Sequence, residues 1–174
     1  IYSDSGQSSP LDWSATYEFR ADTLRRFNPL PYILQLLQEI HGLRSQSGEL
    51  YSVFAELYSN ALEHGVLNLD SALKCDAAGF AQYYTLRNSR LAALEEGYIR
   101  IHLQVRPQGV GGVLRIVVED SGKGFDPKQV LAKPPSVHGL SGRGVNLVRQ
   151  LSHSAGWSED GRSAHVEFTW ESQA

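Results

Sequence analysis

The feature that most constrains the fold is a pair of apolar segments between residues 98 and 120. In "YIRIHLQVR", the residues Ile99, Ile101, Leu103 and Val105 alternate with polar ones, which is the pattern of a half-buried strand. "GVLRIVVED" is a denser apolar run, and the turn-forming stretch "PQGVGG" separates the two. The two segments are predicted to pair as neighbouring strands, whose apolar face another layer of the protein has to cover.

The rest of the chain supplies candidates for that layer. The order of elements predicts an α+β two-layer sandwich, in which helices cover one face of a mixed, mainly antiparallel sheet. We expect residues 1–12 to be a linker or a frayed terminus, and residues 13–174 to form a single domain with a helical insertion at about 70–97. The predicted elements are a strand over 13–21, a helix over 32–43 after Pro29 and Pro31, a helix from Gly48 to about Gly65, two helical pieces over 71–96 broken near Gly79, a helix over 145–156 and a closing strand over 163–170.

Composition excludes several classes of function. The 174 residues carry a formal charge of −3, without the basic stripe that binding to nucleic acid requires. No apolar run approaches the roughly 20 residues of a membrane span. Cys75 is the single cysteine, which suits a cytoplasmic protein. The chain begins at Ile1 and lacks Met, so we expect it to be a piece of a longer protein.

The first motif lies on the predicted helix over 48–65, where "ELYSNALEHG" contains Glu56, Asn60 and His64 at four-residue spacing. At about 100° per residue, Asn60 lies about 40° and His64 about 80° around the helix from Glu56. The three side chains therefore form one slanting stripe. The simpler interpretation is that the stripe is the solvent-exposed face of an amphipathic helix. Asn is a poor helix former, however, so its presence indicates a role other than solvation of the helix.

The second motif, "EDSGKGF", follows the predicted strand that ends at Asp120. A carboxylate at a strand end can accept a hydrogen bond from an exocyclic amine, and Gly122 and Gly124 would let the backbone approach a flat ring or a phosphate. By itself this pattern is also that of an ordinary turn.

The third motif, "HGLSGRGVNLV", places Gly139, Gly142 and Gly144 ahead of a helix predicted to begin near Val145. A glycine-rich loop at a helix N-terminus offers backbone N–H groups and a positive dipole end to phosphate oxygens, and Arg143 adds a fixed charge. The alternative is a flexible connector. The spacing matches neither a P-loop nor a Rossmann fingerprint.

Taken together, these motifs resemble the GHKL (Bergerat) ATP-binding superfamily of gyrase, histidine kinases, mismatch-repair MutL and the ninety-kilodalton heat-shock chaperones. "ELYSNALEHG" resembles its N box, "DSGKGF" its first glycine box and "GLSGRGVNLV" its second. The resemblance implies the cofactors ATP and Mg²⁺. It implies that Asn60 binds Mg²⁺ and that Asp120 accepts a hydrogen bond from the adenine amino group, in a pocket shaped by Gly122 and Gly124.

The same resemblance assigns the remaining motif residues. It implies that the loop with Gly139, Gly142, Arg143 and Gly144 covers the phosphates, and that His64 caps or lines the pocket. In second glycine boxes of this type the sequence usually continues R-G-x-G, whereas Asn146 stands in place of the last glycine here.

Within the superfamily, the form E-x-x-x-N-A-x-x-H resembles the anti-sigma-factor serine kinases. In these kinases Glu56 would be the general base that takes the proton of the substrate serine. The implied partners are a STAS-domain anti-sigma-factor antagonist, a sigma factor, a response-regulator phosphatase fused upstream and a second copy in a homodimer. Two alternatives stay open: a binding module without catalysis, and the catalytic domain of a histidine kinase.

Overall fold

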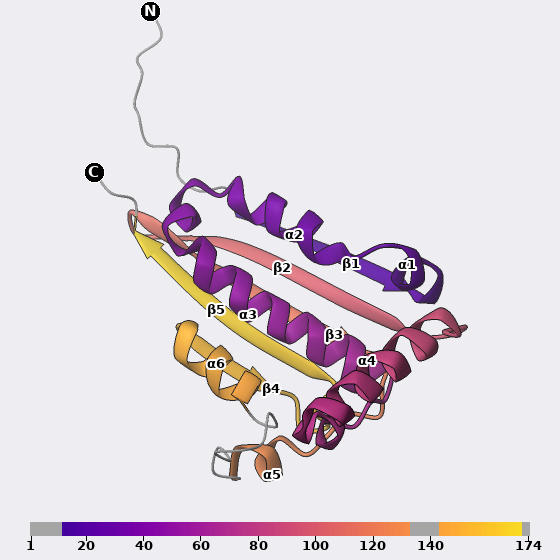
Figure 1. Cartoon of the computed structure of the whole chain (residues 1–174). Coiled ribbons are helices and arrows are strands. Elements are labelled where there is room, and N and C mark those ends of the chain that lie inside the picture. Colours follow the sequence, from indigo (N-terminus) through magenta and orange to yellow (C-terminus); the bar gives the residue numbers. More distant parts are fainter. Residues whose placement is uncertain (1–11, 133–142, 172–174) are drawn as a thin grey trace, which may run out of the picture.

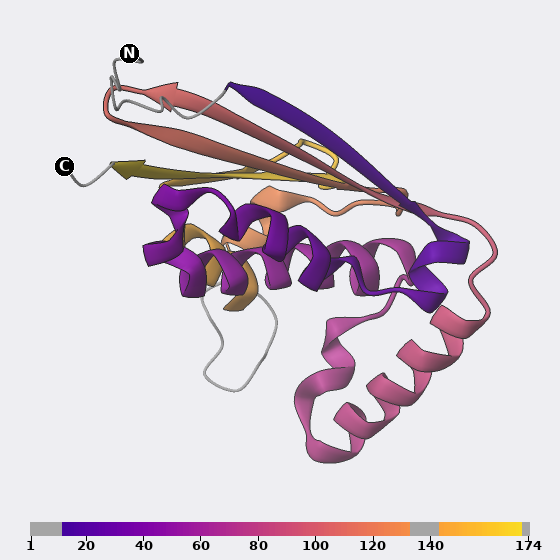
Figure 2. The same ribbon diagram turned by 90° about the horizontal axis from the view of Figure 1, so that it is seen from above.

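A computed structural model of the chain describes residues 12–132 and 143–171. The predicted linker over 1–12 lies outside these residues except for Asp12. Within them, a sheet and a layer of helices pack face to face (Figures 1 and 2). The strands are β1 (Trp13–Arg20), β2 (Tyr98–Gln108), β3 (Gly111–Asp120), β4 (Ser154–Trp157) and β5 (Ser163–Glu171). The α-helices are α1 (Ala21–Arg26), α2 (Pro29–Gln38), α3 (Ser47–Ser59), α4 (Ala77–Ala92), α5 (Pro127–Ala132) and α6 (Arg143–Leu151).

The sheet has the strand order β1-β2-β3-β5-β4, and all four of its pairings are antiparallel. The predicted hairpin is confirmed: β2 and β3 pair from Ile99 opposite Asp120 to Gln108 opposite Gly111. Alternate residues of these strands are buried, including Ile101 and Ile116 at 0% exposure. The predicted α+β sandwich is therefore confirmed, although the sheet of the described strands is entirely antiparallel and not mixed.

The helices cover only one face of the sheet. Figure 2 shows α2, α3 and α6 below the strands, and no helix of the described chain lies on the opposite side. The buried face of α3 includes Leu50, Val53, Phe54 and Leu57, which join the strand residues in one hydrophobic core. Burial of each such side chain stabilises the fold by about 1.5–3 kcal/mol before the entropic cost of ordering it.

The helix that carries the first motif changes its winding in the middle of that motif. It is α-helical to Ser59 and continues as a π-helix over Asn60–Val66, where the Leu67 N–H donates to Leu62 O at 2.8 Å. A π-helix turns less per residue than an α-helix. Four residues of a π-helix fall slightly short of a full turn, whereas four residues of an α-helix exceed one, so Asn60 and His64 stay on the same face.

The insertion after this helix consists of a 3-10 helix, Ser71–Cys75, and α4. We predicted the break between the two pieces near Gly79, but it lies three residues earlier. The Asp76 side chain accepts a hydrogen bond from Gly79 N at 2.7 Å and caps α4, so Gly79 belongs to the first helical turn. In Figure 2 the insertion projects from one end of the helix layer.

Other boundaries also differ from the predictions. The helix predicted over 145–156 begins at Arg143 and ends at Leu151, because residues 154–157 pair with β5 as β4. The helix predicted over 32–43 begins at Pro29 and ends at Gln38, and a separate 3-10 helix follows over His41–Gln46. Pro29 and Pro31 lie in the first turn, where a missing N–H removes no helical hydrogen bond. Among the described helices, none combines the length and apolar character needed to cross a membrane.

Candidate functional site

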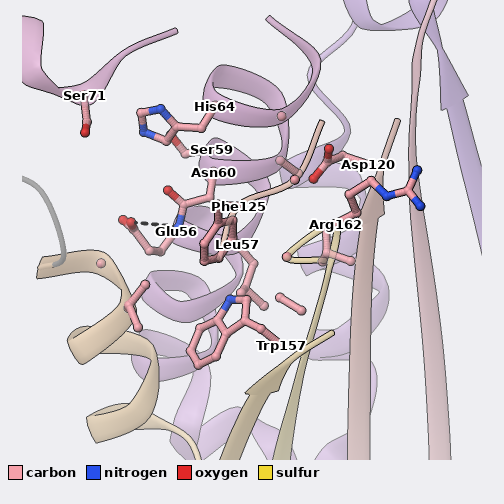
Figure 3. A pocket seen from close by; sticks show the side chains of 18 of the residues that line it. Glu56, Leu57, Ser59, Asn60, His64, Ser71, Asp120, Phe125, Trp157 and Arg162 are labelled. Carbon is pink, nitrogen blue, oxygen red and sulfur yellow. Dashed lines mark hydrogen bonds between the residues drawn. The ribbon is translucent and has the colours of Figure 1, made fainter. Parts of the chain in front are cut away.

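Most of the predicted motif residues that the structure describes meet at a cavity of about 490 Å³ between the helix layer and one end of the sheet. Figure 3 shows Glu56, Asn60 and His64 along one side of this cavity and Asp120 on the other. The full lining is Glu56, Leu57, Ser59, Asn60, Ala61, His64, Gly65, Ser71, Lys74, Phe80, Val118, Asp120, Gly124, Phe125, Gly144, Val145, Trp157, Gly161, Arg162 and Ala164. Its size and its mixture of aromatic and polar groups are typical of a small-molecule site.

Glu56 and Asn60 act as a hydrogen-bonded pair on the cavity wall. Asn60 Nδ2 donates to Glu56 Oε1 at 3.2 Å. Because the amide nitrogen donates to Glu56, the amide oxygen of Asn60 can accept a hydrogen bond or bind a cation. An amide oxygen is a ligand that Mg²⁺ accepts, usually together with water and phosphate oxygens.

His64 is fixed by the backbone just beyond its own helix. Its Nδ1 lies 2.7 Å from the carbonyl oxygen of Leu69. A carbonyl can only accept, so Nδ1 carries the hydrogen, and in the neutral ring Nε2 is an acceptor. His64 thus offers the cavity an oriented ring, as expected for a residue that lines the pocket.

Asp120 is a buried acid at the end of β3, only 8% exposed. The alternation that buries Leu114, Ile116 and Val118 places its side chain on the same, helix-facing side of the sheet. Burial raises the pKa of Asp120 to about 6, although the hydrogen bond from Gly122 N to Oδ1, at 2.8 Å, opposes this shift. A desolvated carboxylate is stabilised by any ligand that brings a hydrogen-bond donor to it.

Two glycines let backbone pack against this end of the cavity. Gly124 has φ +76°, and a Cβ there would overlap the carbonyl oxygen of Asp160. A Cβ at Gly65 would overlap the Asp120 carboxylate, so the end of the π-helix can approach the acid only as glycine. Gly122 hydrogen-bonds to Asp120 but is not part of the cavity lining.

The second glycine box is described only in part. Gly139 and Gly142 lie outside the described residues, and only the backbone of Arg143 is described, as the first residue of α6. Gly144 lines the cavity, and a Cβ there would overlap Glu56 Oε1, so α6 packs directly against the acid. Asn146 is helical, so the substitution for glycine meets no left-handed backbone at this position.

Several lining residues had no predicted role. Phe125 follows Gly124 directly, and Gly65 ends the first motif, so both are adjacent to a sequence signal. Trp157 enters through β4, which the sequence did not predict, and Ser71, Lys74 and Phe80 enter from the insertion. The contribution of these four depends on how distant segments pack.

The cavity chemistry fits ATP with Mg²⁺ on observations of this structure. The buried acceptor Asp120 and the ring of Phe125 suit an aminopurine, while the free oxygen of Asn60 suits a hard cation. Among the described residues no group of three or more His, Cys, Asp or Glu side chains could hold a metal by itself. One protein oxygen supplemented by phosphate oxygens is a usual arrangement for Mg²⁺.

The described structure has an antiparallel sheet covered by helices on one face, and an amide and a strand-end acid line the same cavity. These features are those of a GHKL-type ATP-binding domain. The chain belongs to the family "Histidine kinase-, DNA gyrase B-, and HSP90-like ATPase", whose pattern its residues 45–173 match. The match includes α3, the insertion, α6 and four of the five strands. No curated protein matches the chain at a significant level.

Proposed function

We propose that the protein is an ATP- and Mg²⁺-dependent serine-protein kinase that also acts as a partner-switching regulator. Its substrate would be a STAS-domain anti-sigma-factor antagonist. One observation carries the proposal: the carboxylate of Glu56 lies in the cavity of an ATP-binding domain, hydrogen-bonded to Asn60 at 3.2 Å. A phosphotransferase to serine needs a carboxylate at this kind of position, whereas simple nucleotide binding does not.

The roles of the residues follow from their chemistry. Bound ATP and Mg²⁺ would supply the phosphoryl group and neutralise the charge of the phosphates. Asn60 would hold the cation through its amide oxygen, and Asp120 would accept a hydrogen bond from the adenine amino group. Glu56 would accept the proton of the substrate serine as its hydroxyl oxygen bonds to the γ-phosphorus and the bond to the β-phosphate oxygen breaks. The products are phosphoserine and ADP.

Glu56→Gln tests this assignment because glutamine keeps the size and the hydrogen-bonding oxygen but is not a base. With labelled ATP and purified STAS-domain proteins, we expect phosphotransfer to fall by about 10²- to 10⁴-fold. Binding of ATP and of the antagonist should persist. Glu49→Gln is the matched control, since Glu49 is an exposed acid in the first turn of the same helix and does not line the cavity.

The result also separates the main alternatives. A wild-type protein that binds the antagonist but leaves it unmodified in the presence of Mg²⁺ and ATP would contradict the kinase proposal. The domain would then be a binding module that sequesters the antagonist or a sigma factor. Phosphorylation of histidine in place of serine would indicate a histidine-kinase domain.

A further inference from the structure

The insertion supplies part of the wall of the nucleotide cavity. Ser71, Lys74 and Phe80 line it, although none of them belongs to a recognised motif. We propose that Lys74 binds the phosphate groups of the nucleotide, so that the insertion is part of the binding site. This inference rests on the ATP-binding component of the proposed function and does not require the kinase reaction.

The ammonium group of Lys74 is held in a defined place. Lys74 Nζ lies 3.2 Å from Glu63 Oε2 and 4.1 Å from the centre of the Tyr83 ring. The lysine side chain is 20% exposed and that of Glu63 only 9%. A lysine restrained in this way loses less conformational entropy when it binds a ligand than a free surface lysine does.

The cluster around Glu63 carries excess positive charge. The Glu63 carboxylate forms ion pairs with Lys74 and with the Nε of Arg87, the latter at 2.8 Å. It also accepts a hydrogen bond from the hydroxyl of Tyr83 at 2.7 Å. Two cations therefore share one anion, which leaves one positive charge uncompensated within the cluster. Of the two cations, Lys74 lines the cavity and Arg87 does not.

Among the described lining residues, few other charges can meet a polyphosphate. Among the described lining residues, Lys74 and Arg162 are the Lys and Arg side chains. Arg162 is paired with Asp160 at 2.8 Å, and Figure 3 shows its guanidinium group pointing away from the cavity. The Glu56 and Asp120 carboxylates would repel phosphate, which makes a facing cation more important.

The insertion lies at the end of the cavity that is opposite Asp120, where the phosphate groups are expected (Figure 3). Figure 3 shows Ser71 on the same side as His64 and Asn60, away from Asp120. If adenine contacts Asp120, its phosphates extend toward this side. Lys74 belongs to the same five-residue 3-10 helix as Ser71, and a lysine ammonium is a common phosphate ligand.

Lys74→Gln in the full 174-residue chain tests the inference, with ATP and adenosine affinities measured by calorimetry in the presence of Mg²⁺. A charge-assisted hydrogen bond to phosphate predicts that ATP affinity falls about tenfold or more while adenosine affinity changes less than about twofold. Lys74→Arg should retain most of the ATP affinity. A lower salt dependence of ATP binding in Lys74→Gln is the second expected result.

Arg87→Gln is the matched control, because it removes the other cation from Glu63 without changing the cavity lining. We expect its ATP affinity to stay within about threefold of wild type, since the charge removed is farther from the ligand. Equal losses for ATP and adenosine in Lys74→Gln, or equal ATP losses in the Lys74 and Arg87 variants, would overturn the inference. Wild-type protein that does not bind ATP would overturn it together with the nucleotide assignment, whereas normal ATP binding without phosphotransfer would contradict the kinase proposal alone.

Discussion

At the scale of single residues, Asp120 shows how a site can oppose stability. The strand alternation that buries its apolar neighbours also buries a carboxylate, with one backbone N–H as its hydrogen-bond donor in the described structure. Burial raises the pKa of Asp120 to about 6. Ionising this carboxyl group therefore costs more free energy in the folded state than in the unfolded state. A ligand with an amino group at this point would recover part of that free energy.

Asp120→Asn should therefore stabilise the folded protein at neutral pH. The raised pKa means that the folded state binds the proton more tightly than the unfolded state, so this acid lowers stability as pH rises from about 4 to about 6. We expect the free energy of unfolding at pH 7 to increase by roughly 1–3 kcal/mol in the variant, and the difference to vanish below about pH 4. Denaturant titration across this pH range measures both effects.

The same substitution also bears on recognition of adenine. ATP affinity should fall in Asp120→Asn while affinity for inorganic triphosphate is retained, since the lost acceptor faces the base. Parallel losses for the two ligands would contradict the assignment of Asp120. The stability prediction would be contradicted if Asp120→Asn were less stable than wild type at pH 7, because the buried carboxylate would then have a stabilising partner.

At the scale of elements, the insertion is attached to the π-helix through Glu63. Burial disfavours the charged form of this acid, but the Tyr83 hydrogen bond, the charge of Lys74 and the hydrogen bonds from Arg87 and Lys74 outweigh burial and lower its pKa. Arg90 adds hydrogen bonds from its guanidinium group to the carbonyls of Leu67 and Asn68, at 2.8 and 2.6 Å. Polar contacts thus connect the insertion to the helix that carries Asn60.

Glu63→Ala should loosen the insertion without unfolding the sheet. It leaves two cations and a hydroxyl group without their shared acceptor, which for partly buried partners costs about 2–3 kcal/mol. Amide hydrogen exchange over residues 71–92 should become roughly 30- to 150-fold faster, while β2 and β3 stay protected. Unchanged exchange in the insertion, or equal acceleration in the sheet, would contradict this role, and Glu49→Ala is the control on the exposed side of α3.

At the scale of the whole molecule, the cavity lies between layers that meet only in the folded state. Its walls come from α3 and the π-helix, the insertion, α6 and three strands of one sheet. A ligand that contacts all of these segments binds the folded chain and not the unfolded one. Binding should therefore be visible as an increase in global stability.

Mg²⁺ with ATP at about 100 times its Kd should stabilise the chain by about 2.7 kcal/mol. For a protein of this length, that corresponds to an increase in Tm of roughly 5–10 °C. Thermal denaturation followed by circular dichroism measures it. Asn60→Ala is the control, and an equal increase in that variant would contradict metal-assisted binding through Asn60.

Most of the fold could be predicted from the sequence, because its strongest signals are periodic. The alternation of Ile99, Ile101, Leu103 and Val105 follows directly from a strand with one buried face. β4 could not be predicted, since "SAGW" has little preference for a strand and becomes one by pairing with β5. The π-helix was likewise missed, because the same residues fit an α-helical period.

The candidate site divides in the same way. Glu56, Asn60, Asp120, Gly124 and Gly144 belong to short motifs with a chemical reason for their spacing, and all line one cavity. Lys74 has no such signal. Its relevance depends on Glu63 and on the path of the insertion, neither of which a local pattern contains.

The sequence by itself determined the layered α+β architecture and the chemical groups of the three motifs, because periodicity and residue type act locally along the chain. The tertiary structure alone decided the winding at Asn60, the burial that raises the pKa of Asp120 and the entry of Lys74 into the cavity wall. These properties depend on distances between segments far apart in the sequence. Solvent exclusion and charge pairing exist only after those segments have packed.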